Sequence, residues 1–184
     1  MTQWRGEKIA EVNEEILEQY LKVVKKWFYV TDIGFVVPRN YSNIDVLGYG
    51  HIKYKYYDFE VKYRSAYSLA NNGEDIFYLV QQFTKFKEQR EEKLKEYIGK
   101  NKSVKVVVTT HKMMGKKIKK RNEMEKSFKD AMKKEGFHRS EIWYFDNMIP
   151  ELVEAVPEKG KYNTQLLQTI RMLKIYRAKE MPVQ

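Results

Sequence analysis

Residues 43–64, NIDVLGYGHIKYKYYDFEVKYR, decide the fold. They contain two strand-like runs, residues 44–47 and about residues 54–63, joined by a glycine-containing turn. Alternating apolar and polar residues around such a turn predict two adjacent antiparallel strands. The other elements predicted from the sequence lie before and after this hairpin in the chain.

Charged side chains gather on one face of the predicted hairpin. Strand alternation places Asp58, Glu60 and Lys62 on the same face. Asp45 opposes its apolar neighbours on the first strand, so in a hairpin it converges with Glu60 and Lys62 at one end. Two carboxylates and an ammonium group at the end of a buried sheet cost free energy unless something uses them. A hard divalent cation such as Mg²⁺ would use them, because it binds carboxylate oxygens and accepts substrate phosphate oxygens.

A helix and a strand are predicted ahead of the hairpin. Apolar residues recur at helical spacing from about residue 7 to residue 26, and residues 28–37 are typical of a strand with a bulge or turn at Thr31-Asp32. Three acids lie along one edge of the helix, namely Glu7, Glu11 and Glu14. Any of the three is a candidate for the acid that faces the metal.

These residues resemble a nuclease signature. Asp45, followed fifteen positions later by Glu60-Val61-Lys62, is similar to the D…(D/E)xK motif of the PD-(D/E)xK nuclease superfamily. The sequence departs from that motif at its start, where Asn43-Ile44-Asp45 replaces Pro-Asp. The pattern Glu14-x-x-Leu17-x-x-x-Leu21, followed by Trp27-Phe28-Tyr29-Val30, looks like the first helix and strand of archaeal Holliday-junction resolvases and related archaeal-virus (fuselloviral) nucleases. The resemblance covers roughly the first hundred residues.

The resemblance implies a Mg²⁺-dependent endonuclease, with Mn²⁺ able to substitute, that acts as a homodimer on DNA, Holliday-junction-like DNA included. In this interpretation Asp45 and Glu60 hold the metal, with the Val61 carbonyl as a further ligand. Glu14, whose spacing to the following leucines matches the family, joins them directly or through water. Lys62 orients the attacking water or stabilises developing charge.

The remaining elements predict an α/β fold. A long helix of roughly residues 74–98 precedes an apolar strand at residues 104–109, which indicates a crossover and a parallel strand pair. A last strand (141–145), a loop (146–147), a short helix (150–156) and a final helix (164–176) follow. The order gives the αβββαβ core of the restriction-endonuclease-like fold, a mixed central sheet flanked by helices, with an extra C-terminal strand and helix, as one domain over residues 1–184.

Composition favours a polyanionic partner. Lys and Arg number 35 against 25 Asp and Glu, which gives a net charge of +10 and a pI near 9.4. Cysteine is absent, so disulfides and thiolate metal sites are excluded. No signal peptide or membrane-spanning apolar run is found, so we expect no membrane and a cytoplasmic location, in a host cell if the protein is viral.

Most of the excess positive charge falls in residues 112–134, which hold ten basic residues against three acidic ones. Such a face can bind nucleic-acid phosphates without reading sequence, although a solvated lysine-rich helix gives the same pattern. The candidate DNA-binding residues are Lys116, Lys117, Lys119, Lys120 and Arg121, together with Arg39 in a loop expected beside the site.

Two other functions fit the sequence. The chain could be a nuclease that cuts unbranched DNA or RNA, or a non-catalytic nucleic-acid-binding module that keeps the nuclease fold. A binding module has no need to retain Asp45, Glu60 and Lys62 together, so the geometry of these three residues distinguishes the alternatives.

Overall fold

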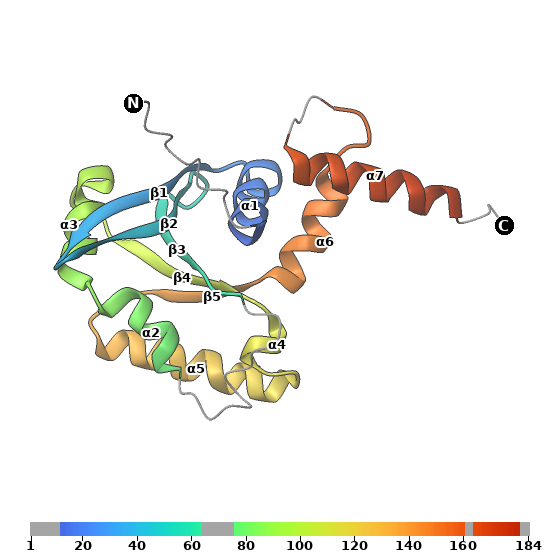
Figure 1. Cartoon of the computed structure of the whole chain (residues 1–184). Helices are drawn as coiled ribbons and strands as arrows, with labels where there is room; N and C mark the ends of the chain where they lie inside the picture. The colour runs from blue at the N-terminus through green and yellow to red at the C-terminus, as the bar shows by residue number, and fades with distance from the viewer. Residues whose placement is uncertain (1–11, 64–75, 161–163, 181–184) are drawn as a thin grey trace.

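A five-stranded mixed sheet organises the chain, with helices on both faces (Figure 1). This computed structural model describes residues 12–63, 76–160 and 164–180, with side chains as far as Tyr176 in the last helix. The strands are β1 (Phe28–Val37), β2 (Asn40–Gly50), β3 (Lys55–Val61), β4 (Ser103–Thr109) and β5 (Ser140–Tyr144). The helices are α1 (Val12–Gln19), the π-helix η1 (Tyr20–Lys25), α2 (Phe77–Thr84), α3 (Lys87–Ile98), α4 (His111–Met114), α5 (Ile118–Lys134), α6 (Phe145–Ala155) and α7 (Gln165–Glu180).

The sheet order is β1-β2-β3-β4-β5. β1, β2 and β3 pair antiparallel, whereas β3, β4 and β5 run parallel to one another. Parallel neighbours need crossover connections, and here α2 with α3 and then α4 with α5 supply them. The α/β class, the mixed sheet and the parallel pairing of residues 104–109 with the hairpin are therefore confirmed.

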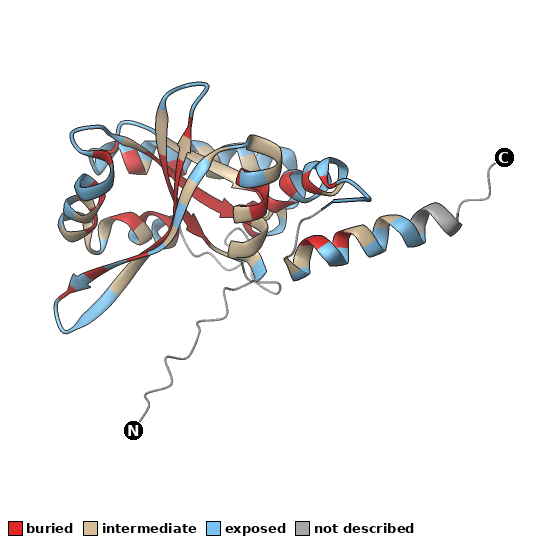
Figure 2. Cartoon of the chain, turned by 90° about the horizontal axis from the view of Figure 1, so that it is seen from above, coloured by how far each residue is buried: buried red, intermediate tan, exposed pale blue. Residues whose placement is uncertain are grey.

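Each face of the sheet has its own apolar core. The central strands between these cores are buried along most of their length (Figure 2). On one face, odd-numbered residues of β3 such as Phe59 pack with α1, η1 and α6. On the other face, Val107 of β4 packs with α2, α4 and α5. A third cluster joins β1 and β2 to Leu94 and Ile98 of α3. Asp58 and Glu60 alternate with Phe59, so they point toward the α3 side and not into the first core.

The predicted helix over residues 74–98 is divided in two. Phe86 leaves the helical region with φ −134° and ψ 46°, which separates α2 from α3. Phe83 packs in the α2–α5 core, whereas Leu94 and Ile98 pack against the β1–β2 hairpin. One straight helix could not serve both cores, so the chain bends between them.

The predicted loop at residues 146–147 is wrong, because α6 begins directly after β5 and is continuous through Pro150. Phe145, Met148 and Leu152 follow helical spacing and are buried against the first core. Burial of this stripe outweighs the loss of one backbone hydrogen bond at the proline. In α7, the Thr164 hydroxyl accepts a hydrogen bond from the Leu167 N–H at 3.3 Å and so caps the amino end of the helix.

The described residues contain no helix long and apolar enough to cross a membrane. The expected bulge at Thr31-Asp32 is absent, because the register is the same on both sides of it, from Thr31↔Val46 to Ile33↔Ile44, and no extra residue is inserted. Asp32 has a left-handed backbone with a φ of 50° inside a continuous β1. In this register Asp32 lies opposite Asp45, so the irregular backbone position is in the strand next to the one that carries this acid.

Candidate active site

Asp45 and Glu60 come together at the carboxyl end of β3. Val46 of β2 pairs with Phe59, which brings Asp45 beside Glu60. The backbone N–H of Val61 donates a 2.7 Å hydrogen bond to Asp45 Oδ2. Asp45 is 7% exposed and Glu60 is 4% exposed, so both carboxyl groups are largely removed from water. The predicted hairpin thus produces the predicted convergence.

Lys62 is a cation that lies within 4 Å of both carboxyl groups. Its Nζ lies 2.9 Å from Glu60 Oε2 and 3.7 Å from Asp45 Oδ2. The Lys62 N–H donates to the Val108 carbonyl at 2.8 Å, which holds the residue at the end of β3 beside β4. Burial alone would lower the pKa of Lys62, but Glu60 and Asp45 outweigh it and raise that pKa. Lys62 therefore stays protonated near neutral pH and acts as a fixed positive charge.

Arg90 of α3 is a member of the site that we did not predict. Its guanidinium NH1 donates to Glu60 Oε1, and its Nε and NH2 donate to the two oxygens of Asp58. Arg90 is 3% exposed and Asp58 is fully buried. Burial would raise the pKa of Asp58, but Arg90 and then Lys105 lower it, so Asp58 is ionised. Arg90 thereby holds the Glu60 side chain in one rotamer from the side of the sheet that α3 covers.

The charges form a continuous buried chain. Lys105 Nζ of β4 lies 2.8 Å from Asp58 Oδ2 and also pairs with Glu91 of α3. From this lysine, ion pairs run through Asp58 and Arg90 to Glu60. The chain connects the amino ends of the parallel strands to the candidate site at their carboxyl ends.

The carboxyl group of Asp45 has a raised pKa and so holds its proton to higher pH than an ordinary aspartate. Desolvation, followed by the charge of Glu60, raises the pKa of Asp45 to about 7, even though Lys62 and the Val61 N–H favour the ionised form. Glu60 has two strong cationic partners, whereas Asp45 has only the more distant Lys62 among the described residues. The positive charge of Lys62 therefore does not offset the burial of the Asp45 carboxylate beside Glu60.

We expect this shift to make the metal-free protein less stable as pH rises. The pKa of Asp45 is raised on folding, from 3.8 to about 7, so its stabilising contribution is complete below pH 3.8 and is lost as pH rises through 7. Asp45→Asn removes this dependence. Relative to the wild type, the free energy of unfolding of this variant should increase by up to about 4 kcal/mol as pH rises from 3.8 to about 7. Above that pH the difference should stay constant.

Urea unfolding in EDTA at a series of pH values from 5 to 8 measures this difference. The exposed carboxylate variant Asp130→Asn is the matched control, and its stability should follow the wild type at every pH. A constant gap between wild type and Asp45→Asn across the series would contradict the raised pKa.

The donor set fits a hard divalent cation. Mg²⁺ is commonly held by one or two carboxylates, with waters and substrate oxygens completing its shell. Asp45 and Glu60 supply two, and the raised pKa of Asp45 reports a site that would gain from a second cation. No set of three or more acidic or histidine side chains in the described ranges is placed to hold a metal ion.

The predicted helix acid, Glu14, lies on α1, and its charge contributes to the raised pKa of Asp45 as the smallest of the causes. It does not complete a three-ligand set in this arrangement. A contribution through water therefore fits its position better than direct ligation. The other two candidates, Glu7 and Glu11, lie outside the described residues.

Arg39 is not at the site. Pro38 and Arg39 form a two-residue turn between β1 and β2, where Arg39 is exposed with a φ of 66°. The six residues to Asp45 span roughly 20 Å of extended strand, along a hairpin that projects from the body of the molecule (Figure 2). The expected loop is part of β2, which begins at Asn40, so the prediction that Arg39 lies beside the carboxylates is wrong.

The basic stretch lies on the same edge of the sheet as Lys62. β3 and β4 end together, and the chain passes from β4 through α4 to residues 115–117 and α5. Four of its lysines, Lys116, Lys117, Lys119 and Lys120, are exposed. Arg121 differs, because its NH1 donates to the carbonyls of Gly115 and Lys116 at 3.2 and 2.9 Å and so holds this turn in place.

No family model matches the chain, and no curated protein or solved structure matches it either. The function is therefore argued from the site itself.

Proposed function

We propose that this chain is a metal-dependent nuclease that hydrolyses phosphodiester bonds in DNA, built on a restriction-endonuclease-like core. The observation that carries the proposal is the convergence of Asp45 and Glu60, with Lys62 within 4 Å of both, at the carboxyl end of β3. The order of one helix, three antiparallel strands, a helical crossover and a parallel strand supports the same fold. The PD-(D/E)xK resemblance is consistent with it.

In this proposal Asp45 and Glu60 hold Mg²⁺ or Mn²⁺, with the Val61 carbonyl as a further ligand and Glu14 acting through water. The bound metal would lower the pKa of a water molecule and neutralise charge on the scissile phosphate. Lys62, protonated and fixed by Glu60, stabilises the negative charge that develops on the phosphate. Arg90 keeps Glu60 oriented while it binds.

The exposed lysines after β4 are proposed to bind DNA phosphates. Replacing Lys116, Lys117 and Lys119 by alanine should weaken binding equally across sequences and lower the slope of log affinity against log salt by about 3. The charge-matched control is Lys126→Ala with Lys133→Ala and Lys134→Ala, from the middle and the carboxyl end of α5. Equal slopes for the wild type and the first variant would show that this face is only solvated.

A homodimer would give two such sites. The apolar residues of the last strand (142–145) and of the final helix are the two candidates for such an interface, but Tyr144 and Phe145 are buried within the chain. The projecting helix α7 is better suited, since it exposes Met172, Leu173, Ile175 and Tyr176 (Figure 1). Sedimentation equilibrium at low micromolar concentration should give a dimer for the wild type and a monomer for Leu173→Glu, with Gln168→Glu as control. A monomeric wild type in this experiment would contradict the homodimer hypothesis.

A non-catalytic DNA-binding module is the second candidate. It is favoured by one observation: both oxygens of Glu60 already have cationic partners, Arg90 and Lys62. A carboxylate paired in this way can hold the sheet end together without any metal.

A cleavage panel tests the proposal and its preferred substrate. Four-way junction, flap, duplex and single-stranded DNA, with an RNA strand beside them, are incubated with the full chain and Mg²⁺, Mn²⁺ or EDTA. We expect metal-dependent cleavage with the junction cut most rapidly. Equal cleavage of junction and linear duplex would contradict a preference for junctions but would still support nuclease activity. Binding without cleavage in either metal would favour the non-catalytic binding module.

A further inference from the structure

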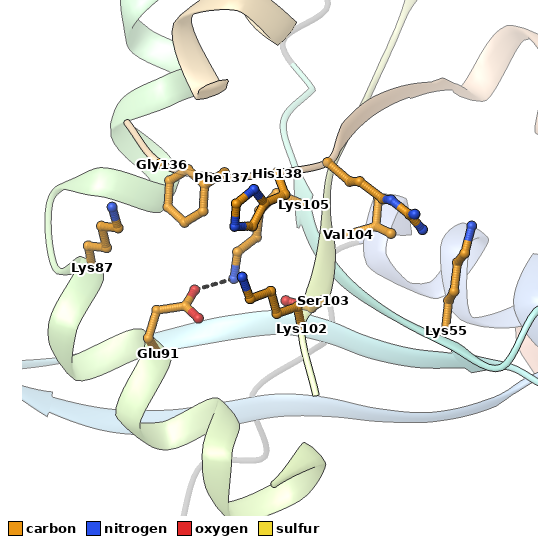
Figure 3. A pocket seen from close by; sticks show the side chains of 11 residues that line it. Lys55, Lys87, Glu91, Lys102, Ser103, Val104, Lys105, Gly136, Phe137 and His138 are labelled. Carbon is orange, nitrogen blue, oxygen red and sulfur yellow. Dashed lines mark hydrogen bonds and ion pairs between the residues drawn. The ribbon is translucent and has the colours of Figure 1, made fainter. Parts of the chain in front are cut away.

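A basic pocket of about 430 Å³ lies at the opposite edge of the sheet from the candidate active site. Its floor is formed where the parallel strands begin, at Lys55 of β3, Ser103 of β4 and Arg139 just before β5. One wall is α3, and the other is the turn at residues 136–138 (Figure 3). A pocket of this size suits a small organic ligand and is too confined for a nucleic-acid duplex.

The lining carries a large excess of positive charge. Five cationic side chains surround the pocket, and the only carboxylate among the lining residues is Glu91. The lining cations are Lys55, Lys87, Lys102, Lys105 and Arg139. Glu91 is already paired with the buried Lys105 (Figure 3). Lys105 also pairs with Asp58. Lys87 donates to the Glu135 carbonyl and lies over the Phe137 ring.

The other three cations have no such compensation. Among the described residues, Lys55, Lys102 and Arg139 have no acidic partner, although they line one pocket. Like charges held together repel one another, and a bound anion would relieve that repulsion. The buried Lys105 in the pocket wall is thus neutralised by Asp58 and Glu91, whereas these three cations keep their charge uncompensated within the described residues.

Ser103 provides an independent sign of a ligand. Its hydroxyl oxygen is buried and has no hydrogen-bond partner within the described ranges, and the residue lines the same pocket. Buried polar groups are nearly always paired, so an unpaired hydroxyl beside unpaired cations indicates a missing partner. A phosphate oxygen would accept the hydroxyl proton and the charged N–H donors together.

We propose that this pocket binds a small ligand with two or more linked phosphate groups, such as a nucleoside triphosphate or an inorganic polyphosphate. Lys55 and Lys87 line opposite sides of the pocket (Figure 3), which favours a ligand that carries its negative charge on more than one phosphate group. The site is separate from Asp45 and Glu60 and does not depend on the proposed nuclease activity. Its ligand would contact the end of the buried ion-pair chain at Lys105 and Glu91.

Isothermal titration calorimetry of the full chain in EDTA tests the proposal with ATP, tripolyphosphate, inorganic phosphate and adenosine. We expect saturable binding of ATP and tripolyphosphate, affinity for inorganic phosphate weaker by about tenfold or more, and no binding of adenosine. If ATP binds and tripolyphosphate does not, the ligand is a nucleotide; binding of both indicates that linked phosphates suffice. Equal binding of adenosine and ATP, or no binding of either polyphosphate, overturns the proposal.

Variants locate the binding. Lys102→Ala with Arg139→Ala should weaken ATP binding by about tenfold or more, whereas the charge-matched pair Lys22→Ala with Lys133→Ala should bind as the wild type does. Ser103→Ala should weaken binding without lowering the thermal stability, because it removes an unpaired buried hydroxyl. Equal losses in the two paired variants would mean that net charge alone attracts ATP. A Lys102/Arg139 effect on duplex DNA binding, with no polyphosphate bound, would assign the pocket to nucleic acid instead.

Discussion

Asp45→Asn should reduce the rate of DNA cleavage by about a thousandfold or more while DNA affinity remains close to that of the wild type. The asparagine can still accept the Val61 N–H, so the local backbone is retained, but it cannot bring a negative charge to the metal. Single-turnover cleavage of a labelled junction, with affinity measured separately in Ca²⁺ or EDTA, separates the two effects.

Asp45 is a better choice for this test than Glu60. Glu60→Gln would also remove the ion pair with Arg90 and leave that buried guanidinium only partly compensated, so a loss of activity could reflect a loss of structure. Asp130→Asn is the matched control and should cleave at the wild-type rate. Cleavage by purified Asp45→Asn at the wild-type rate would show that Asp45 holds no catalytic metal.

Arg90→Met should have the largest effect on stability. It removes a buried cation that donates to both Asp58 and Glu60, and it leaves Lys105 as the only remaining cation paired with Asp58 among the described residues. We expect the free energy of unfolding to fall by about 3–5 kcal/mol, the usual range when one partner of a buried ion pair is removed. Urea denaturation followed by circular dichroism measures the change.

Lys93→Met on the same helix is the control for this experiment. Lys93 pairs with Glu96 at the helix surface, where water screens the ion pair, so its loss should change stability far less than the loss of Arg90. Where Arg90→Met does not fold, Arg90→Lys keeps the charge but not the forked geometry, and it should raise the Mg²⁺ concentration needed for half-maximal cleavage. A stability loss for Arg90→Met no larger than that for Lys93→Met would show that the buried ion network is not needed for stability.

The sheet could be predicted from the sequence because its signals are local. Alternation along residues 54–63 fixed which side chains share a face, and the first strand was placed at the residues that β1 occupies. The bend at Phe86 could not be found in this way. Phe83 and Leu94 belong to one apolar stripe in the sequence but to different cores in the structure. Only the tertiary arrangement determines that division.

The site was predictable only in part, for a similar reason. Asp45, Glu60 and Lys62 are linked by one hairpin, so strand alternation was enough to bring them together. Arg90 reaches them from a helix thirty residues later in the chain. A signal did exist, since Arg90 lies seven residues after Phe83 and four before Leu94, on the apolar stripe of the predicted helix. A charge on such a stripe, like Lys105 within a buried strand, indicates a buried partner of opposite charge.

Nicking of supercoiled plasmid by the full chain is the most direct test that Asp45, Glu60 and Lys62 form a metal-dependent nuclease centre. We expect Mg²⁺ or Mn²⁺ to support nicking by the wild type, EDTA to stop it, and added Mg²⁺ in excess of the chelator to restore it. Asp45→Asn should stay inactive throughout. Plasmid that remains supercoiled with wild-type protein in both metals, under conditions where the protein binds DNA, would contradict the assignment of Asp45, Glu60 and Lys62 as a nuclease centre.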